Sequence, residues 1–169
     1  MKIKELKELA KTWSFRHGIM DTFFEAMLSG YASDVKKGTM SELPGSKMIP
    51  YACGSWEAVD TYLVTPLCNR SGGMTVISYE EIPVWMMSYF GEYDKEAIPC
   101  LKAALRHLYE RENFYGWRGP DIFRHGGFTY RNSPDNTSSM PDHFTGIEEV
   151  CGIDGTVKGW HRYHGGFMI

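Results

Sequence analysis

The stretch that decides the fold is MTVISYEEIPVWMMSYF, residues 74–90. Both halves are rich in β-branched and aromatic residues, and only two glutamates separate them, so we expect a β-hairpin. Pro83 stands at the start of the second strand, where a missing backbone N–H is tolerated. The alternation from Val84 to Tyr89 leaves neither strand face polar. This pattern predicts a strand that is covered, at least in part, on both sides.

Further segments with strand character lie before and after this hairpin. They are residues 55–64, 121–132, 143–153 and 156–169. The last two are joined by Asp154-Gly155, a dipeptide typical of tight hairpin turns. Residues 36–47 instead contain many turn-forming residues, and we interpret them as a loop with a turn at Pro44-Gly45. The apolar end of the chain is then expected to be a strand docked in the sheet.

Three segments show helical spacing of their apolar residues. Residues 3–13 form the first, and Gly18 is expected to end it. Asp21 can cap a second helix over residues 21–30, with Gly30 as its C-terminal stop. The clearest helix is predicted within residues 97–113, with Pro99 in its first turn, where proline is tolerated.

The order helix, helix, strands, helix, strands predicts an α+β protein. Strands that follow one another through short turns pair antiparallel. We therefore expect a twisted antiparallel sheet of about six to eight strands, packed with one central helix and two N-terminal helices. A length of 169 residues suits a single domain, residues 1–169.

Composition narrows the classes of function. A net charge of −3 argues against general binding of nucleic acid or membrane surfaces, which needs a basic excess. The start of the chain lacks the features of a signal peptide, and no apolar run approaches the roughly 20 residues of a membrane span. Four cysteines without CxxC spacing, and histidines without HxH or HExxH spacing, predict no metal site. We expect a cytoplasmic protein with reduced thiols and no cofactor.

Several short motifs follow one another along the chain. They are LPGSK, W…D.Y, Y…PVWMMSYFG, RGP, F.G.E and YHGG. In this order they resemble a bacterial and archaeal family of domains of unknown function, the DUF5680-like family, some of whose members are fused to helix-turn-helix regulators. The resemblance spans about residues 23–169 and leaves residues 1–20 outside as a helical extension. It implies an α+β fold with an antiparallel sheet and no established activity. Residues 71–75, which read SGGMT, depart from the family pattern.

The closing strand offers two candidate ligand-binding residues. Strand alternation places Arg162 and His164 on one face with Trp160, and His161 and Tyr163 on the other, so the two histidines cannot chelate one metal ion. Arg162 and His164 are predicted to face a pocket and hold an anion. The alternative is structural, with His164 as a hydrogen-bonded, half-buried ring beside a glycine bulge.

Two loops add further candidates. In PGSK, successive N–H groups of a tight turn beside Lys47 can bind an anion, although a plain surface turn explains the same residues. After the central helix, Trp117 and Arg118 suit stacking on a planar ring. The alternative places Trp117 as a plug over the core.

Asp60 lies in an aromatic strand segment. It shares a strand face with Trp56 and Tyr62. A buried acid needs a partner, so Asp60 is a candidate general acid or base, or an acceptor of hydrogen bonds from a loop backbone.

Three hypotheses of function follow. The first is a module for sensing or sequestering a small anionic or aromatic ligand such as a nucleotide. Its charged and polar residues are Lys47, Asp60, Tyr62, Arg118, Arg162 and His164, and its stacking residues are Trp56, Trp85 and Trp117. The second is a hydrolase that acts on a similar ligand through His164 or Asp60. The third is a protein-interaction domain in which the first helix packs on a partner, such as a second copy of the chain.

Overall fold

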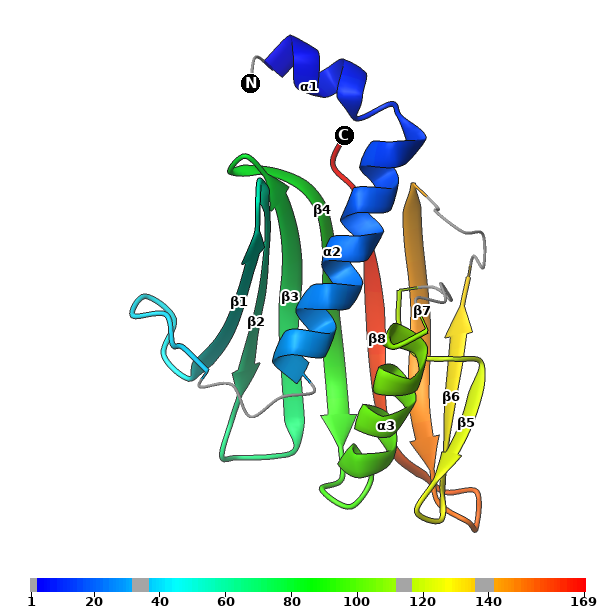
Figure 1. Ribbon diagram of the computed structural model, residues 1–169. Helices are drawn as coiled ribbons and strands as arrows, with labels where there is room; N and C mark the ends of the chain where they lie inside the picture. Colours follow the sequence, from blue (N-terminus) through cyan, green and yellow to red (C-terminus); the bar gives the residue numbers. More distant parts are fainter. Residues whose placement is uncertain (1–2, 32–36, 112–116, 136–141) are drawn as a thin grey trace.

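The computed structural model describes residues 3–31, 37–111, 117–135 and 142–169. Within these residues the chain forms three helices and an eight-stranded antiparallel sheet, which confirms the α+β class (Figure 1). The helices are α1 (Ile3–Leu9), α2 (Trp13–Tyr31) and α3 (Ile98–Tyr109). The strands are β1 (Ser46–Cys53), β2 (Trp56–Val64), β3 (Arg70–Tyr79), β4 (Ile82–Tyr93), β5 (Ile122–His125), β6 (Phe128–Pro134), β7 (His143–Cys151) and β8 (Val157–Phe167).

The strand order is β1-β2-β3-β4-β8-β7-β6-β5. Neighbouring strands follow one another in sequence except at the centre, where the last strand, β8, pairs with both β4 and β7. The predicted hairpin of β3 and β4 is confirmed, as is the turn at Asp154-Gly155, where Gly155 has a φ of 80°. The apolar end of the chain is therefore a central strand of the sheet.

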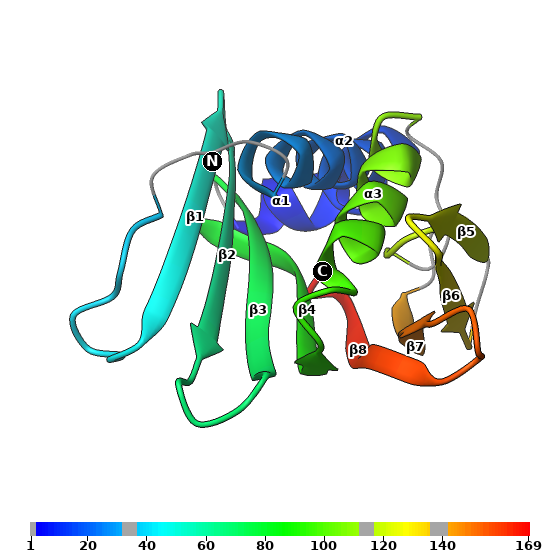
Figure 2. The ribbon, with the colours of Figure 1, turned by 90° about the horizontal axis from the view of Figure 1, so that it is seen from below.

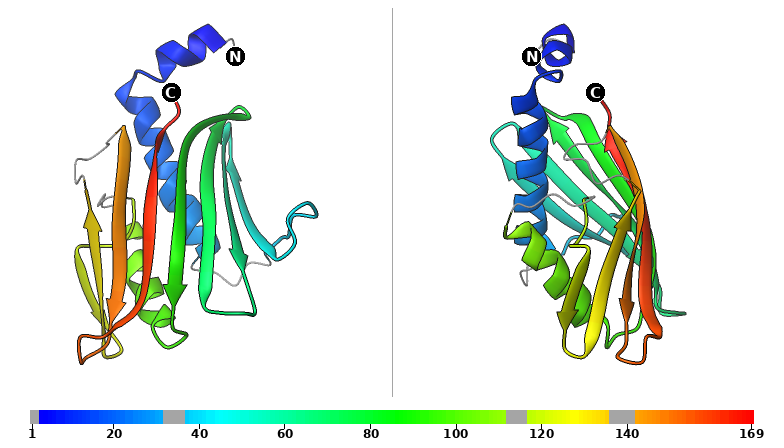
Figure 3. Two further views of the ribbon diagram at one scale, coloured as in Figure 1. Left: turned by 180° about the vertical axis from the view of Figure 1, so that it is seen from behind. Right: turned by 90° about the vertical axis from the view of Figure 1, so that its right-hand side faces the viewer.

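The helices lie on one side of this sheet only. Figure 2 shows the strands curving around α2 and α3, and Figure 3 shows no helix on the opposite side of the described strands. We call that opposite side the open face. Strand β4 is covered on both sides in part, as expected: the neighbours Val84 and Trp85 are both 0% exposed, whereas Phe90 further along lies on the open face with 52% of its surface exposed.

The core between helices and sheet is built from aromatic rings. The ring of Phe23 on α2 makes edge contacts with Trp85 of β4 and with Trp117, both at 5.3 Å between ring centres. Trp85 and Trp117 lie 4.6 Å apart, and Phe144 of β7 packs against both. Trp85 is 0% and Trp117 1% exposed, so the structure places these two predicted stacking residues inside the core and not at a ligand site.

The boundary predicted between the two N-terminal helices is wrong. Gly18 and Asp21 both lie inside α2, whose single run covers Trp13–Tyr31. A Cβ atom on Gly18 would lie 2.7 Å from Cζ2 of Trp56, so this glycine allows the helix to approach the sheet closely. Helix α1 is separate and short, with Leu6 buried and Ile3 exposed.

Two further strand assignments differ from the sequence-based predictions. Strand β1 was not predicted, because Pro50 and the preceding loop hide its pattern; as an edge strand it tolerates proline. Residues 121–132 form not one strand but the hairpin of β5 and β6, which turns at Gly126 and Gly127 with positive φ. Gly165 and Gly166 continue the regular pairing of β8, so the predicted glycine bulge is absent there.

None of the helices in the described ranges is both long and apolar enough to cross a membrane.

The substitution Trp85→Ala tests whether the stability of the fold depends on the helix-facing side of the sheet. We expect Trp85→Ala to lower the free energy of unfolding by about 3–5 kcal/mol, because it empties the centre of the aromatic core. Phe90→Ala is the matched control on the open face of the same strand, and we expect a loss of less than about 0.5 kcal/mol. Urea denaturation followed by circular dichroism measures both. Equal losses would contradict a one-sided core.

Candidate functional site

A buried carboxylate organises the polar part of the helix-facing side. Glu148 on β7 is 0% exposed. Its Oε1 atom accepts hydrogen bonds from Arg118 and from Nδ1 of His161, the latter at 3.3 Å. Its Oε2 atom accepts a hydrogen bond of 2.7 Å from the hydroxyl of Tyr130. Three segments distant in sequence therefore meet at one side chain.

The charge of Glu148 is fixed by these partners. Burial alone would raise the pKa of Glu148, but the charge of Arg118 and the hydrogen bonds from His161 and Arg118 outweigh it, and the pKa falls to about 2. Burial by itself would lower the pKa of Arg118, whereas the neighbouring carboxylate raises it well above its ordinary value. Both groups therefore stay charged, because an unpaired charge at this depth would be costly.

The same network holds the chain that follows α3 against the sheet. Trp117 has a φ of 63°, rare for a large side chain, and this turn sends its ring into the core while Arg118 reaches Glu148. The N–H of Gly119 donates to the Tyr130 hydroxyl at 3.0 Å, and its carbonyl accepts from Asn132 at 2.8 Å. Arg118 is thus a structural ion-pair partner in the site.

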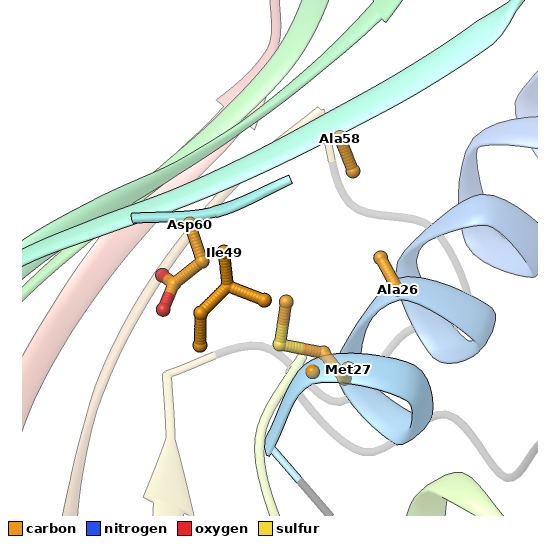
Figure 4. A pocket seen from close by; sticks show the side chains of 6 residues that line it. Ala26, Met27, Ile49, Ala58 and Asp60 are labelled. Atoms are coloured by element: carbon orange, nitrogen blue, oxygen red, sulfur yellow. The ribbon is translucent and has the colours of Figure 1, made fainter. Parts of the chain in front are cut away.

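Asp60 is held on β2 in a mainly apolar setting. Figure 4 shows its side chain beside Ile49 and Met27, around a cavity of only about 10 Å³, room for about one water molecule. Its carboxylate accepts hydrogen bonds from Thr75 at 2.8 Å and Tyr89 at 3.0 Å. Burial raises the pKa of Asp60, and these two hydrogen bonds only partly offset that effect.

A larger cavity lies where β2 and β4 end and β1 and β3 begin, next to the start of α3. Its volume is about 440 Å³. Its polar and aromatic lining residues are Lys37, Lys47, Tyr62, Thr65, Asn69, Arg70, Ser71, Tyr89, Tyr93, Lys95, Lys102 and His161. We call this the basic cavity, because four lysines and one arginine line it and no Asp or Glu of the described residues does.

Two of the lysines lie near one aromatic ring, that of Tyr62. The ammonium of Lys37 donates to the Tyr62 hydroxyl at 2.6 Å and lies 5.2 Å from the ring centre. The ammonium of Lys47 lies 5.8 Å from the same ring. Arg70 pairs with Glu92 at 3.3 Å, whereas no ion pair with a carboxylate is found for Lys37, Lys47 or Lys95 in the described part of the chain. The charged groups of the described residues that line the cavity are therefore net positive, in a chain whose overall charge is negative.

The structure brings together only some of the residues predicted to bind a ligand. Lys47 and Tyr62 line the basic cavity. Asp60 and Arg118 lie behind its wall: Asp60 bonds to Tyr89, and the Arg118 guanidinium lies 5.6 Å from the centre of the same ring.

The remaining candidates lie elsewhere. Trp56 is at the other end of β2, packed against Phe15 and Tyr79. Arg162 and His164 are exposed on the open face, as the predicted alternation of β8 implies, and His164 bonds to Ser88 at 3.0 Å. The idea that Arg162 and His164 share a pocket with Lys47 and Arg118 is therefore wrong, because opposite faces of one sheet separate them. Asp60 lies on the helix-facing side and His164 on the open face, so the hydrolase hypothesis, which uses His164 or Asp60, has these two residues at separate places and stays a prediction.

The prediction overlooked two residues of the cavity wall. The sequence pattern places His161 on the face opposite His164, which the structure confirms, but it predicts no role for His161. Ser71 stands in the sequence only as part of a departure from the family pattern. Its Oγ atom lies 3.4 Å from Nε2 of His161, 90 positions further along the chain. Strand alternation was a usable signal for His161, whereas no local motif marks Ser71.

The described residues contain no group of three or more His, Cys, Asp or Glu side chains that could hold a metal ion. The basic cavity instead offers ammonium, hydroxyl and imidazole groups, a set that suits anions.

The buried ion pair can be tested against an exposed one. We expect Glu148→Gln to lower the free energy of unfolding by about 3–5 kcal/mol, because Arg118 is left buried without its counter-charge. The double variant Glu148→Gln/Arg118→Met should lose less free energy of unfolding than Glu148→Gln alone, because no buried charge is left unpaired. Glu92→Gln, which breaks the exposed pair with Arg70, should cost less than about 1 kcal/mol. Urea denaturation measures the free energy of unfolding of each variant. A double variant that is less stable than Glu148→Gln would contradict the pairing.

Asp60 should make stability depend on pH in a defined direction. Its raised pKa means that the native state binds the proton more tightly than the unfolded chain, so stability is lost as pH rises from the ordinary Asp pKa of 3.8 through the raised value. Asp60→Asn should remove this loss. The free energy of unfolding of the variant relative to wild type should therefore rise as the pH increases above the ordinary Asp pKa of 3.8. Asp21→Asn, exposed on α2, is the control, and a parallel rise for it would contradict the assignment.

Comparison with known proteins gives one match. Residues 68–168 match a domain of unknown function, DUF5680. No curated protein and no solved structure matches the chain. The matched residues contain Y…PVWMMSYFG, RGP, F.G.E and YHGG, and they begin after LPGSK and W…D.Y, so the first part of the resemblance seen in the sequence lies outside them. Since more than half of its residues match, the chain belongs to the DUF5680 family.

Proposed function

We propose that this protein binds a small anionic ligand that carries phosphate in the basic cavity. The observation that carries the proposal is a cavity wall with four lysines and an arginine and no carboxylate among the described residues. Like charges gathered at one place repel one another, so such a wall is stabilised by an anion that enters it. The volume of about 440 Å³ suits a small molecule, since ligand pockets usually span roughly 300–1,000 Å³.

The aromatic residues of the wall favour a ligand with a planar ring. Tyr62, Tyr89 and Tyr93 line the basic cavity beside the cations. The ammonium groups of Lys37 and Lys47 lie close to the ring of Tyr62, so positive charge stands next to an aromatic surface. A nucleotide combines a phosphate group with a planar base, so nucleotides are the ligand class that fits best. The role would be sensing or sequestration of such a molecule.

Binding can be tested with pyrophosphate, ADP and adenosine as probes. We expect pyrophosphate and ADP to raise the melting temperature, because binding to the native state stabilises it, and adenosine alone to have little effect. Raising the salt concentration from about 50 mM to about 500 mM should weaken pyrophosphate binding, since salt screens the lysines. If neither phosphate compound shifts the melting temperature, the proposal is wrong.

Two lysine variants locate the site. Lys47→Gln should raise the Kd for pyrophosphate in calorimetry about tenfold, or ~1.4 kcal/mol. Lys4→Gln is the control with the same change of charge, because Lys4 is exposed on α1, at the end of the molecule opposite the β2–β3 connection (Figure 1). Equal effects of both variants would indicate general attraction by charge and not a site.

A further inference from the structure

A row of side chains on the helix-facing side connects the basic cavity to Glu148. The cross-strand register pairs Ser71 with Gly91, Gly91 with His161, and His161 with Glu148. These four residues come from β3, β4, β8 and β7, which are neighbours in that order. In this row, Oγ of Ser71 lies 3.4 Å from Nε2 of His161, and Nδ1 of His161 lies 3.3 Å from Oε1 of Glu148.

Gly91 makes the contact between Ser71 and His161 possible. A Cβ atom at this position would lie 2.7 Å from Cδ2 of the His161 ring and 1.9 Å from the carbonyl oxygen of Trp160. Any other residue would therefore push the imidazole away from β3. With glycine there, the ring crosses β4 and reaches a serine two strands away.

The environment of His161 defines which nitrogen carries the proton. Glu148 is an ionised carboxylate that can only accept hydrogen bonds, so Nδ1 is the nitrogen of His161 that carries a proton and donates it to Glu148. The lone pair of Nε2 then faces the hydroxyl of Ser71, which is the arrangement of a general base beside a nucleophile. The rings of Tyr89 and Tyr93, with centres 5.5 Å and 4.8 Å from that of His161, hold the imidazole in place.

The serine end of the row is open to a ligand, whereas the carboxylate end is closed. Ser71 and His161 both line the basic cavity, and Ser71 is half-buried. Glu148 is fully buried behind them. A molecule in the cavity can thus reach the hydroxyl, and the lysines of the same cavity wall supply positive charge near it.

We propose that Ser71, His161 and Glu148 form a catalytic triad that hydrolyses small carboxylic esters bearing an anionic group; the choice of an anionic substrate rests on the proposed function of the basic cavity. Oγ of Ser71 forms a bond to the acyl carbon while Nε2 of His161 takes the hydroxyl proton. The bond from the acyl carbon to the alcohol oxygen breaks, and that oxygen receives the proton from His161. Water repeats the sequence and releases the carboxylic acid, which restores Ser71.

The open face of the sheet supplies an internal control. Ser88 and His164 form a second serine–histidine pair, with Oγ of Ser88 3.0 Å from Nε2 of His164. This pair is solvent-exposed, lies outside the basic cavity, and has no carboxylate on its histidine in the described part of the chain. If the triad proposal is right, a nearby serine and histidine alone are not enough, and Ser88 stays unreactive.

The test uses the full chain with a fluorophosphonate and with mono-4-nitrophenyl succinate, an anionic ester. We expect peptide mass mapping to find the fluorophosphonate on Ser71, and the ester to release 4-nitrophenolate in a burst. Ser71→Ala should abolish labelling, and His161→Gln should slow the burst by at least about a hundredfold, because it removes the base. Ser88→Ala and His164→Gln should react like wild type. Circular dichroism verifies that each variant is folded. If His161→Gln does not fold, the Ser71→Ala result alone decides between the two outcomes.

The outcomes separate this proposal from the proposed function. Labelling at another residue, or a burst that persists in Ser71→Ala, overturns the triad. If pyrophosphate still stabilises the wild type but Ser71 is never acylated, the binding proposal stands and the triad is wrong. If pyrophosphate has no effect but neutral 4-nitrophenyl acetate acylates Ser71, the triad stands and the anionic substrate class is wrong.

Discussion

The side chain of Glu148 places the strongest constraint on this structure. A carboxylate with no exposed surface needs a counter-charge and hydrogen bonds, and Arg118, Tyr130 and His161 supply them from three different segments. Bringing Arg118 to Glu148 also brings Trp117 into the aromatic core. The closing of the core and the orientation of the His161 ring therefore depend on the same ion pair. A sequence that lost this pair would lose both together.

The two faces of the sheet differ in what covers them. Helices α2 and α3 cover one face, and the aromatic core fills the space between them and the strands (Figure 2). Where the strand ends reach past this core, the same face carries the basic cavity beside the start of α3. The site is thus built on strands whose positions are set by the core, and such a scaffold holds Ser71 and His161 more rigidly than loops would. The opposite face carries Arg162, His164 and Phe90 in contact with solvent.

Charge in this protein is distributed unevenly, and that distribution supports both proposals. The whole chain has a net charge of −3, yet the wall of the basic cavity holds only positive and neutral groups among the described residues. Close to that wall, the two buried acids differ. Glu148 stays ionised beside Arg118, whereas burial raises the pKa of Asp60. Two buried carboxyl groups therefore differ in charge state because their surroundings differ: Glu148 has a cation beside it, whereas Asp60 has hydrogen bonds in a mainly apolar setting.

The sequence by itself determined the class of fold and most of its elements. Period-two and helical patterns are local, so the hairpin of β3 and β4, helix α3 and the alternation of His161 against His164 could all be predicted from neighbouring residues. Local patterns could not show that Gly18 continues α2, because its role is a contact with Trp56, nor that Pro50 lies in an edge strand. Which residues share the site was decided only by tertiary structure. Ser71 and His161 meet because β8 pairs beside β4, and Arg162 is excluded because the sheet has two faces.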